Sequence, residues 1–459
     1  MLKGALLAVA AAIVLTACDG GSSSKAKRSP GGATTFTSTA CGTYSGRGCA
    51  PSASRVDLER PTFSSPTEIT NPLFPISKLR SALLLGHVDD RPFRTETTLL
   101  PGVRSVVWEG ERVLVLVSQY VAYLDGRLEE VAIDRYAQAD DGSVWYFGED
   151  VFNYRDGAVA LTEGTWLAGR DGPAAMIMPG KPEVGNVFRP ENVTGIVFEE
   201  VVLTDVGKTV QGPRGSPVSG AVVAKELHAD GSNDFKTFAP GYGEFRTTSE
   251  GDLEALAVAV PTDAASGPEP AELGVLSTGA IGILELSRLR DWEAAEPTVR
   301  RLNAAWKTLL AAGQPRMVAE RLTENLAALT RAVQARKEEP ASQSAVGVAQ
   351  SVLDLRLRYR PTAEVDADRF HLWTQQLRVD AAASNLAGVT GDVAVLEWIR
   401  DRFVHVLAPA GRREVESRLR DLRAAADARN LSAAADHAAR LGARVQELTG
   451  RARTAAPGS

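Results

Sequence analysis

The spacing of apolar residues changes once along this chain, near residue 286. Before this point, short runs rich in Val, Ile, Tyr and Trp alternate between apolar and polar positions, as in residues 111–124 and 128–138. A period of two is typical of a half-buried β-strand. After this point, apolar residues recur every three or four positions, as they do on amphipathic helices. The pattern predicts an α+β fold, with a sheet domain followed by a helical region.

The turns between the predicted strands favour an antiparallel sheet. Asp-Gly pairs separate β-rich runs at residues 125–126, 156–157 and 230–231, and this dipeptide is a strong signal for a hairpin. No helical pattern lies between these runs, although parallel strands would need such crossovers. We therefore expect an antiparallel meander over residues 70–285. It should curl into a half-barrel or a closed barrel, because curling protects the edge strands.

The helical region is predicted to cover residues 286–453. Val318, Leu322 and Leu326 belong to one of its apolar stripes, and Pro361 and Gly391 mark breaks between helices. Seven helices with short connections are typical of an up-and-down bundle. The last residues, 454–459, are expected to form a disordered tail.

The N-terminal segment has the pattern of a secretory signal. Lys3 gives it a positive start, and the apolar run that follows is too short to span a hydrocarbon core of ~30 Å as a helix. The run leads into Leu15-Thr16-Ala17-Cys18, which resembles the lipobox of bacterial lipoproteins. This resemblance implies that residues 1–17 are removed and that Cys18 carries the lipid. The alternative is an ordinary signal peptide with a chance cysteine.

The lipobox resemblance also implies a location and a tether. The protein would be anchored to the cell membrane by lipid and would face the extracytoplasmic side, in the periplasm or at the cell surface. Residues 18–69 are rich in Ser, Gly, Thr and Pro, which is typical of a flexible tether. With Cys18 lipidated, Cys41 and Cys49 remain as a pair in an oxidising compartment, which favours a disulfide. Free thiols are the alternative.

Composition and motifs exclude several function classes. The chain has 57 acidic and 51 basic residues, with a formal net charge of -6, so no basic excess points to nucleic acid as a partner. The sequence contains no Gly-x-Ser-x-Gly, His-Glu-x-x-His or Gly-x-x-x-x-Gly-Lys motif. We therefore expect neither an enzyme nor a cofactor.

Two groups of side chains are candidates for a site. Trp145, Phe147 and Trp166 lie in an aromatic-rich part of the predicted sheet. They would line an apolar ligand site if the interior is open, as in lipocalin-like barrels, and would be core residues if it is filled. Asp366 and Asp380 fall on the apolar face of a predicted helix. We expect them to form ion pairs with arginines of the preceding helix, and a metal site is the weaker alternative. The expected partners are Arg356, Arg358 and Arg360.

Residues 71–75, 144–149 and 239–243 resemble recurring segments of uncharacterised secreted bacterial proteins, and this resemblance implies no activity. We expect a lipid-anchored binding or scaffold module. Its partners would be the lipid bilayer and either a small apolar ligand or an envelope protein. One alternative is a metal-binding accessory protein that uses carboxylates of the helical bundle. The other is a cell-envelope hydrolase or transferase.

Overall fold

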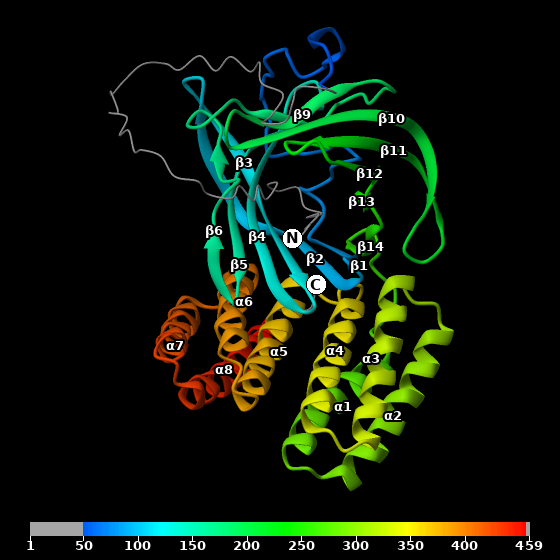
Figure 1. The fold of residues 1–459 in the computed structure, drawn as a ribbon, viewed down its shortest axis with the longest axis vertical. Helices are drawn as coiled ribbons and strands as arrows, with labels where there is room; N and C mark the ends of the chain where they lie inside the picture. The colour runs from blue at the N-terminus through cyan, green and yellow to red at the C-terminus, as the bar shows by residue number, and fades with distance from the viewer. Residues whose placement is uncertain (1–48, 456–459) are drawn as a thin grey trace, which may run out of the picture.

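The computed structural model describes residues 49–455 of the chain, a curved sheet followed by helices (Figure 1). Cys18 and Cys41 lie outside these residues, so the lipid anchor and the Cys41–Cys49 disulfide stay predictions. Within the described range, no helix combines the length and the apolar character needed to cross a membrane.

The sheet of residues 49–455 contains fourteen strands. Their bounds are β1 (Ser81–Val88), β2 (Arg91–Trp108), β3 (Glu111–Leu124), β4 (Arg127–Gln138), β5 (Val144–Arg155), β6 (Ala158–Leu161), β7 (Trp166–Leu167), β8 (Ala175–Met178), β9 (Val187–Val193), β10 (Val197–Gln211), β11 (Pro217–His228), β12 (Asn233–Ala239), β13 (Gly243–Ser249) and β14 (Asp252–Val260).

The strand order consists of two meanders joined in the middle. From edge to edge it is β6-β5-β4-β3-β2-β1-β14-β13-β12-β11-β10-β9, with β7 and β8 paired to β5. All named strand pairs are antiparallel, and at the central junction Ser81 of β1 pairs with Val260 of β14. Asp125 and Gly126 have φ values of 52° and 72° at the β3–β4 turn, as hairpin turns of type I′ require. The predicted antiparallel sheet is confirmed.

The sheet curls until strands from its two meanders meet. The Glu149 side chain of β5 lies close to the Glu191 side chain of β9, although these two strands are not paired through their backbones. The long strands β10 and β11 bend strongly (Figure 1), and their pairing contains register shifts near Leu203 and Lys208, where bulges increase curvature. The sheet is therefore open but encloses an interior on its concave side.

Eight α-helices follow in the described residues. They are α1 (Ala271–Arg288), α2 (Trp292–Ala311), α3 (Arg316–Gln334), α4 (Glu338–Arg356), α5 (Thr362–Ala382), α6 (Leu386–Phe403), α7 (Pro409–Asp427) and α8 (Leu431–Ala455). The predicted domain boundary at residues 285–286 is wrong, because the sheet ends at Val260 and α1 begins at Ala271. Glycines and β-branched residues lower the helix propensity of this segment. It forms a helix because one face is buried, and that face contains Leu273, Leu276, Ala280 and Ile283.

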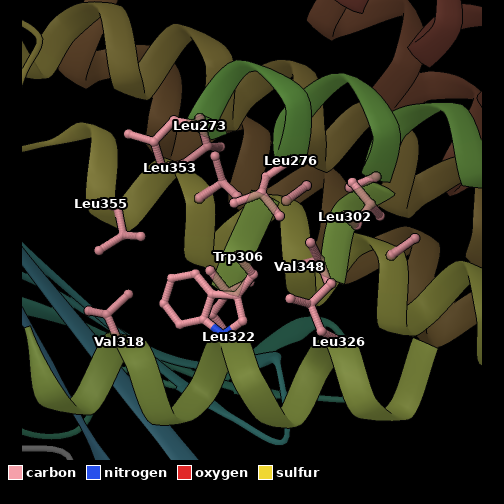
Figure 2. Packing of buried hydrophobic residues seen from close by; sticks show 14 of the residues in the cluster. Leu273, Leu276, Leu302, Trp306, Val318, Leu322, Leu326, Val348, Leu353 and Leu355 are labelled. Atoms are coloured by element: carbon pink, nitrogen blue, oxygen red, sulfur yellow. The ribbon is translucent and has the colours of Figure 1, made fainter. Parts of the chain in front are cut away.

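The helices form two groups, α1–α4 and α5–α8, each around its own core (Figure 1). Helices α1–α4 share one core, in which Trp306 lies close to Leu322 (Figure 2). This core continues into Val258 of β14. Helices α5–α8 share a second core, which includes Val121 of β3 and Val131 of β4. Both groups are thus packed on the sheet.

Buried ion pairs connect the helices to β2. Arg94 Nη1 lies 2.7 Å from Asp354 Oδ2 of α4, and Arg402 Nη1 of α6 lies 2.5 Å from Glu96 Oε2. Arg369 of α5 lies 3.0 Å from Asp354 and 3.7 Å from Glu96. Burial alone would raise the pKa of Glu96, but the surrounding guanidinium groups outweigh it and hold that pKa well below its usual value. This network fixes the helices on the sheet.

Candidate functional site

The aromatic residues predicted to bind a ligand are packed in the core. Trp145, Phe147 and Trp166 are exposed by 4% or less. The Phe147 ring packs edge-on against Trp108 at 6.0 Å, and Trp166 packs edge-on against Tyr146 at 5.5 Å. None of the three lines the polar cavity described below. These side chains pack in the core, and their predicted contact with a ligand stays a prediction.

Asp366 and Asp380 are buried as predicted, but their ion-pair partners are not the predicted ones. Arg127 of β4 donates two hydrogen bonds to the Asp380 carboxylate, at 2.6 and 2.8 Å. Asp366 Oδ1 lies 3.3 Å from Arg369 and 3.8 Å from Arg402. Both aspartates therefore form ion pairs with arginines, as expected, although with other arginines. The predicted partners bond elsewhere, Arg356 and Arg360 to Glu269 and Arg358 to the Asp263 carbonyl.

The concave face of the sheet carries a belt of buried acidic side chains. Strand register places these residues directly opposite one another, for example Asp134 opposite Glu149, and Glu191 opposite Glu199. Directly opposite residues project from the same face of a sheet. We call this set the acidic belt, and each member is at most 4% exposed. Its members are Glu130, Asp134, Glu149, Glu191, Glu199, Glu226, Asp234 and Glu254.

Burial and mutual repulsion raise the pKa of most of these carboxyl groups. Burial, followed by repulsion from Asp134 and other acids, raises the pKa of Glu130 to about 8. Burial and the neighbouring Glu199 raise the pKa of Glu191 to about 8. Neither Glu130 oxygen has a hydrogen-bond partner in residues 49–455. Burial and repulsion from Glu191 raise the pKa of Glu149 well above its usual value. Among the described residues, the acidic belt has too few basic neighbours for all of its carboxyl groups to be ionised at once.

One cavity opens onto the acidic belt. Its volume is about 90 Å³, which is room for several water molecules at about 10–15 Å³ each. Asp134, Glu244 and Glu254 are its acidic lining residues, and its lining contains no lysine, arginine or histidine. Polar and apolar side chains complete the wall, and they include Thr95, Thr97, Ser118, Tyr120, Tyr136, Phe74, Ile76 and Leu79.

Hydrogen bonds position two of the carboxylates in this cavity. The Tyr146 hydroxyl donates to Asp134 Oδ1 at 2.7 Å, and Ser118 donates to Asp134 Oδ2 at 3.2 Å. Thr95 donates a hydrogen bond to Glu254. Burial raises the pKa of Asp134 to about 6, and burial with repulsion from Glu244 raises the pKa of Glu254 to about 8. The cavity thus combines a carboxylate wall with an apolar wall.

A second cluster lies at the end of β11. Glu199, Glu226 and His228 each offer one ligand atom, and these three atoms lie within 4.8 Å of one another. His228 Nδ1 is 3.3 Å from Glu199 Oε1, and its Nε2 is 3.2 Å from Asp234 Oδ2. Burial alone would lower the pKa of His228, but hydrogen bonds to Asp234 and Glu199 raise it to about 11. Lys236 Nζ lies 2.6 Å from Glu226 Oε2.

Sequence reasoning missed both the acidic belt and the His228 cluster. The signal was present in β4, where Glu130 and Asp134 are four residues apart and thus on one face. A polar face is normally the solvent face of a strand. Here the opposite face is covered by helices α5–α8 through Val121 and Val131, and curling encloses the polar face. No protein family model and no curated protein matches this chain. Geometry and chemistry therefore define this candidate site.

Proposed function

We propose that this protein is a lipid-anchored extracytoplasmic binding protein that holds a small organic cation in the cavity of its curved sheet. One observation carries the proposal: Asp134, Glu244 and Glu254 line a cavity that has no basic side chain in its lining. The lipobox resemblance at Cys18 supports the location. The absence of catalytic motifs from the sequence supports binding rather than catalysis.

The cavity chemistry suits an ammonium group with a short apolar tail. Buried carboxylates without a cation are costly to ionise, and an ammonium ion supplies both charge and donors for charge-assisted hydrogen bonds. Asp134 and Glu254 provide the acceptors, while Phe74, Ile76 and Leu79 provide an apolar wall for methylene groups. An anionic ligand would be repelled by the same carboxylates. An apolar ligand would leave them unpaired.

Isothermal titration calorimetry with three matched probes tests this proposal. The full chain, purified in detergent and in an amine-free buffer, is titrated with propylammonium, propanol and propionate. We expect binding of propylammonium alone, because only this probe carries a positive charge. Equal responses to the three probes would refute the proposal, as would no propylammonium binding up to about 10 mM, a limit that corresponds to roughly -3 kcal/mol.

A pair of glutamate variants locates the binding. Glu254→Gln removes a carboxylate from the cavity wall and should weaken propylammonium binding at least about tenfold, or about 1.4 kcal/mol. Glu163→Gln is the matched control, because Glu163 is exposed and lies outside the cavity. Equal affinities of the two variants would place any observed binding elsewhere.

A further inference from the structure

We infer that Glu199, Glu226 and His228 form a binding site for a divalent transition metal ion, separate from the cavity. Two carboxylates and one imidazole converge there from the neighbouring strands β10 and β11. None of the three residues lines the cavity. This inference therefore stands independently of the proposed function.

The distances suit one metal ion. Ligand atoms that bind an ion at ~2.1 Å lie at most ~4.2 Å apart, and the three ligand atoms here lie within 4.8 Å of one another. Small side-chain rotations would close the remaining gap. The 3.3 Å between His228 Nδ1 and Glu199 Oε1 already matches the ~3.4 Å between two ligands of a tetrahedral ion.

The other imidazole nitrogen has a partner of the kind that metal sites use. His228 Nε2 faces Asp234 Oδ2 at 3.2 Å. A metal-bound histidine commonly donates its second N–H to a carboxylate, which orients the ring. Asp234 can therefore position His228 while Nδ1, on the side of Glu199, releases its proton to solvent and binds the ion.

Two buried carboxylate oxygens in or beside the cluster have no hydrogen-bond partner among the described residues. Glu199 is 3% exposed, and its Oε2 has no hydrogen-bond partner in residues 49–455. Glu191, directly opposite on β9, is 1% exposed and its Oε1 also lacks a partner. Buried polar atoms are normally satisfied by protein, water or an ion. These two oxygens are independent of the distances within the cluster.

The local charge also favours a cation. Four carboxylates lie in or beside the cluster, from Glu191, Glu199, Glu226 and Asp234, and Lys236 pairs with Glu226. With His228 neutral, as metal binding requires, the ionised carboxylates and Lys236 leave a net charge of about -3, which a divalent ion reduces to about -1.

The ligand set indicates the class of metal, and the fold offers an entrance. Carboxylate oxygens alone would suit Ca²⁺ or Mg²⁺, but an imidazole nitrogen among them favours Zn²⁺, and the two carboxylates also suit Mn²⁺. Cu⁺ prefers thiolates and thioethers. The His228 side chain is 12% exposed at the end of β11, so an ion can reach the cluster from this end of the sheet.

Titration of the metal-free full chain tests the inference. The protein is treated with EDTA, dialysed, and titrated by calorimetry with Zn²⁺, Mn²⁺, Ca²⁺ and Mg²⁺. We expect one equivalent of Zn²⁺ or Mn²⁺ to bind more tightly than Ca²⁺ and Mg²⁺. The absence of stoichiometric Zn²⁺ and Mn²⁺ binding would overturn the inference, as would a preference for Ca²⁺ or Mg²⁺.

Variants assign the binding to this cluster. His228→Gln should weaken Zn²⁺ or Mn²⁺ binding at least about tenfold, whereas His405→Gln, at an exposed histidine, should not. Glu199→Gln provides a second test if His228→Gln does not fold. Glu254→Gln should leave metal binding unchanged, which separates failure of this inference from failure of amine binding. Unchanged affinity in folded His228→Gln or Glu199→Gln would overturn the assignment.

Discussion

Replacing Glu130 by glutamine should stabilise the protein at alkaline pH. Glu130 is fully buried on β4, and neither of its oxygens has a hydrogen-bond partner in residues 49–455. Burial and neighbouring acids raise its pKa from 4.5 to about 8. An acid whose pKa is raised by folding holds its proton in the native state and loses it in the unfolded chain. The native state therefore loses stability as the pH rises from about 4.5 to 8.

The size of this effect follows from the pKa difference. Each pKa unit corresponds to about 1.36 kcal/mol. The shift of the Glu130 pKa to about 8 therefore lowers the free energy of unfolding by up to ~5 kcal/mol above pH ~8. Between pH 5 and pH 8.5 the change is about 4 kcal/mol. Glutamine keeps the shape of the side chain but cannot ionise. Between these two pH values, the free energy of unfolding of Glu130→Gln should thus rise by about 4 kcal/mol relative to that of the wild type.

Urea unfolding at about pH 5 and about pH 8.5 measures this gain. EDTA and an amine-free buffer are needed in both experiments. A bound cation would stabilise the ionised carboxylates of the acidic belt and so hide the loss of stability. Glu163→Gln, at an exposed position, is the matched control and should show no pH-dependent difference from wild type. If Glu130→Gln changes the free energy of unfolding equally at both pH values, the reasoning about buried acids is wrong.

Three further predictions concern the cavity, the helix–sheet network and the sheet centre. Propylammonium binding should strengthen from about pH 6 to about pH 9, because the Glu254 carboxyl, whose pKa is raised to about 8, must ionise; a flat calorimetric profile would contradict this. Arg402→Met should lower the free energy of unfolding by about 3–5 kcal/mol in urea, since it leaves Glu96 buried with less positive charge; a loss below about 1 kcal/mol would argue against the network. Gly86→Ala should lower the thermal midpoint by at least about 5 °C, because its Cβ would lie 1.7 Å from the Leu253 carbonyl oxygen; an unchanged midpoint would show that β1 and β14 can separate locally.

Local patterns predicted the sheet well. The Asp-Gly turns at residues 125–126 and 156–157 are observed hairpins between paired strands. Alternation also identified the strands themselves. It could not identify the inner face of β4, because Glu130 and Asp134 occupy a face that curling encloses and helices cover the other face. The curvature of the sheet depends on bulges and on contacts between distant strands. The sequence of a single strand does not predict either of them.

The helical region shows the same division between local and distant information. Helical periodicity correctly placed Asp366 and Asp380 on a buried face. Their arginine partners include Arg127 and Arg402, which are distant in sequence or on another helix, so spacing could not identify them. Helix α1 was missed because its glycines and β-branched residues have low helix propensity. Packing against the other helices overrides that propensity.

The junction between β1 and β14 also determines the order in which the molecule can assemble. Each meander can form from hairpins between neighbouring strands, but the pairing of Ser81 with Val260 requires that nearly the whole sheet has been synthesised. Pairing of strands that are so far apart in sequence is slow, because the intervening chain loses conformational entropy before the stabilising contacts form. Helices α1–α4 pack against Leu83 of β1 and Val258 of β14, so their docking surface is completed only at this late step. A chain that ends before β14 would therefore lack part of the surface on which helices α1–α4 pack.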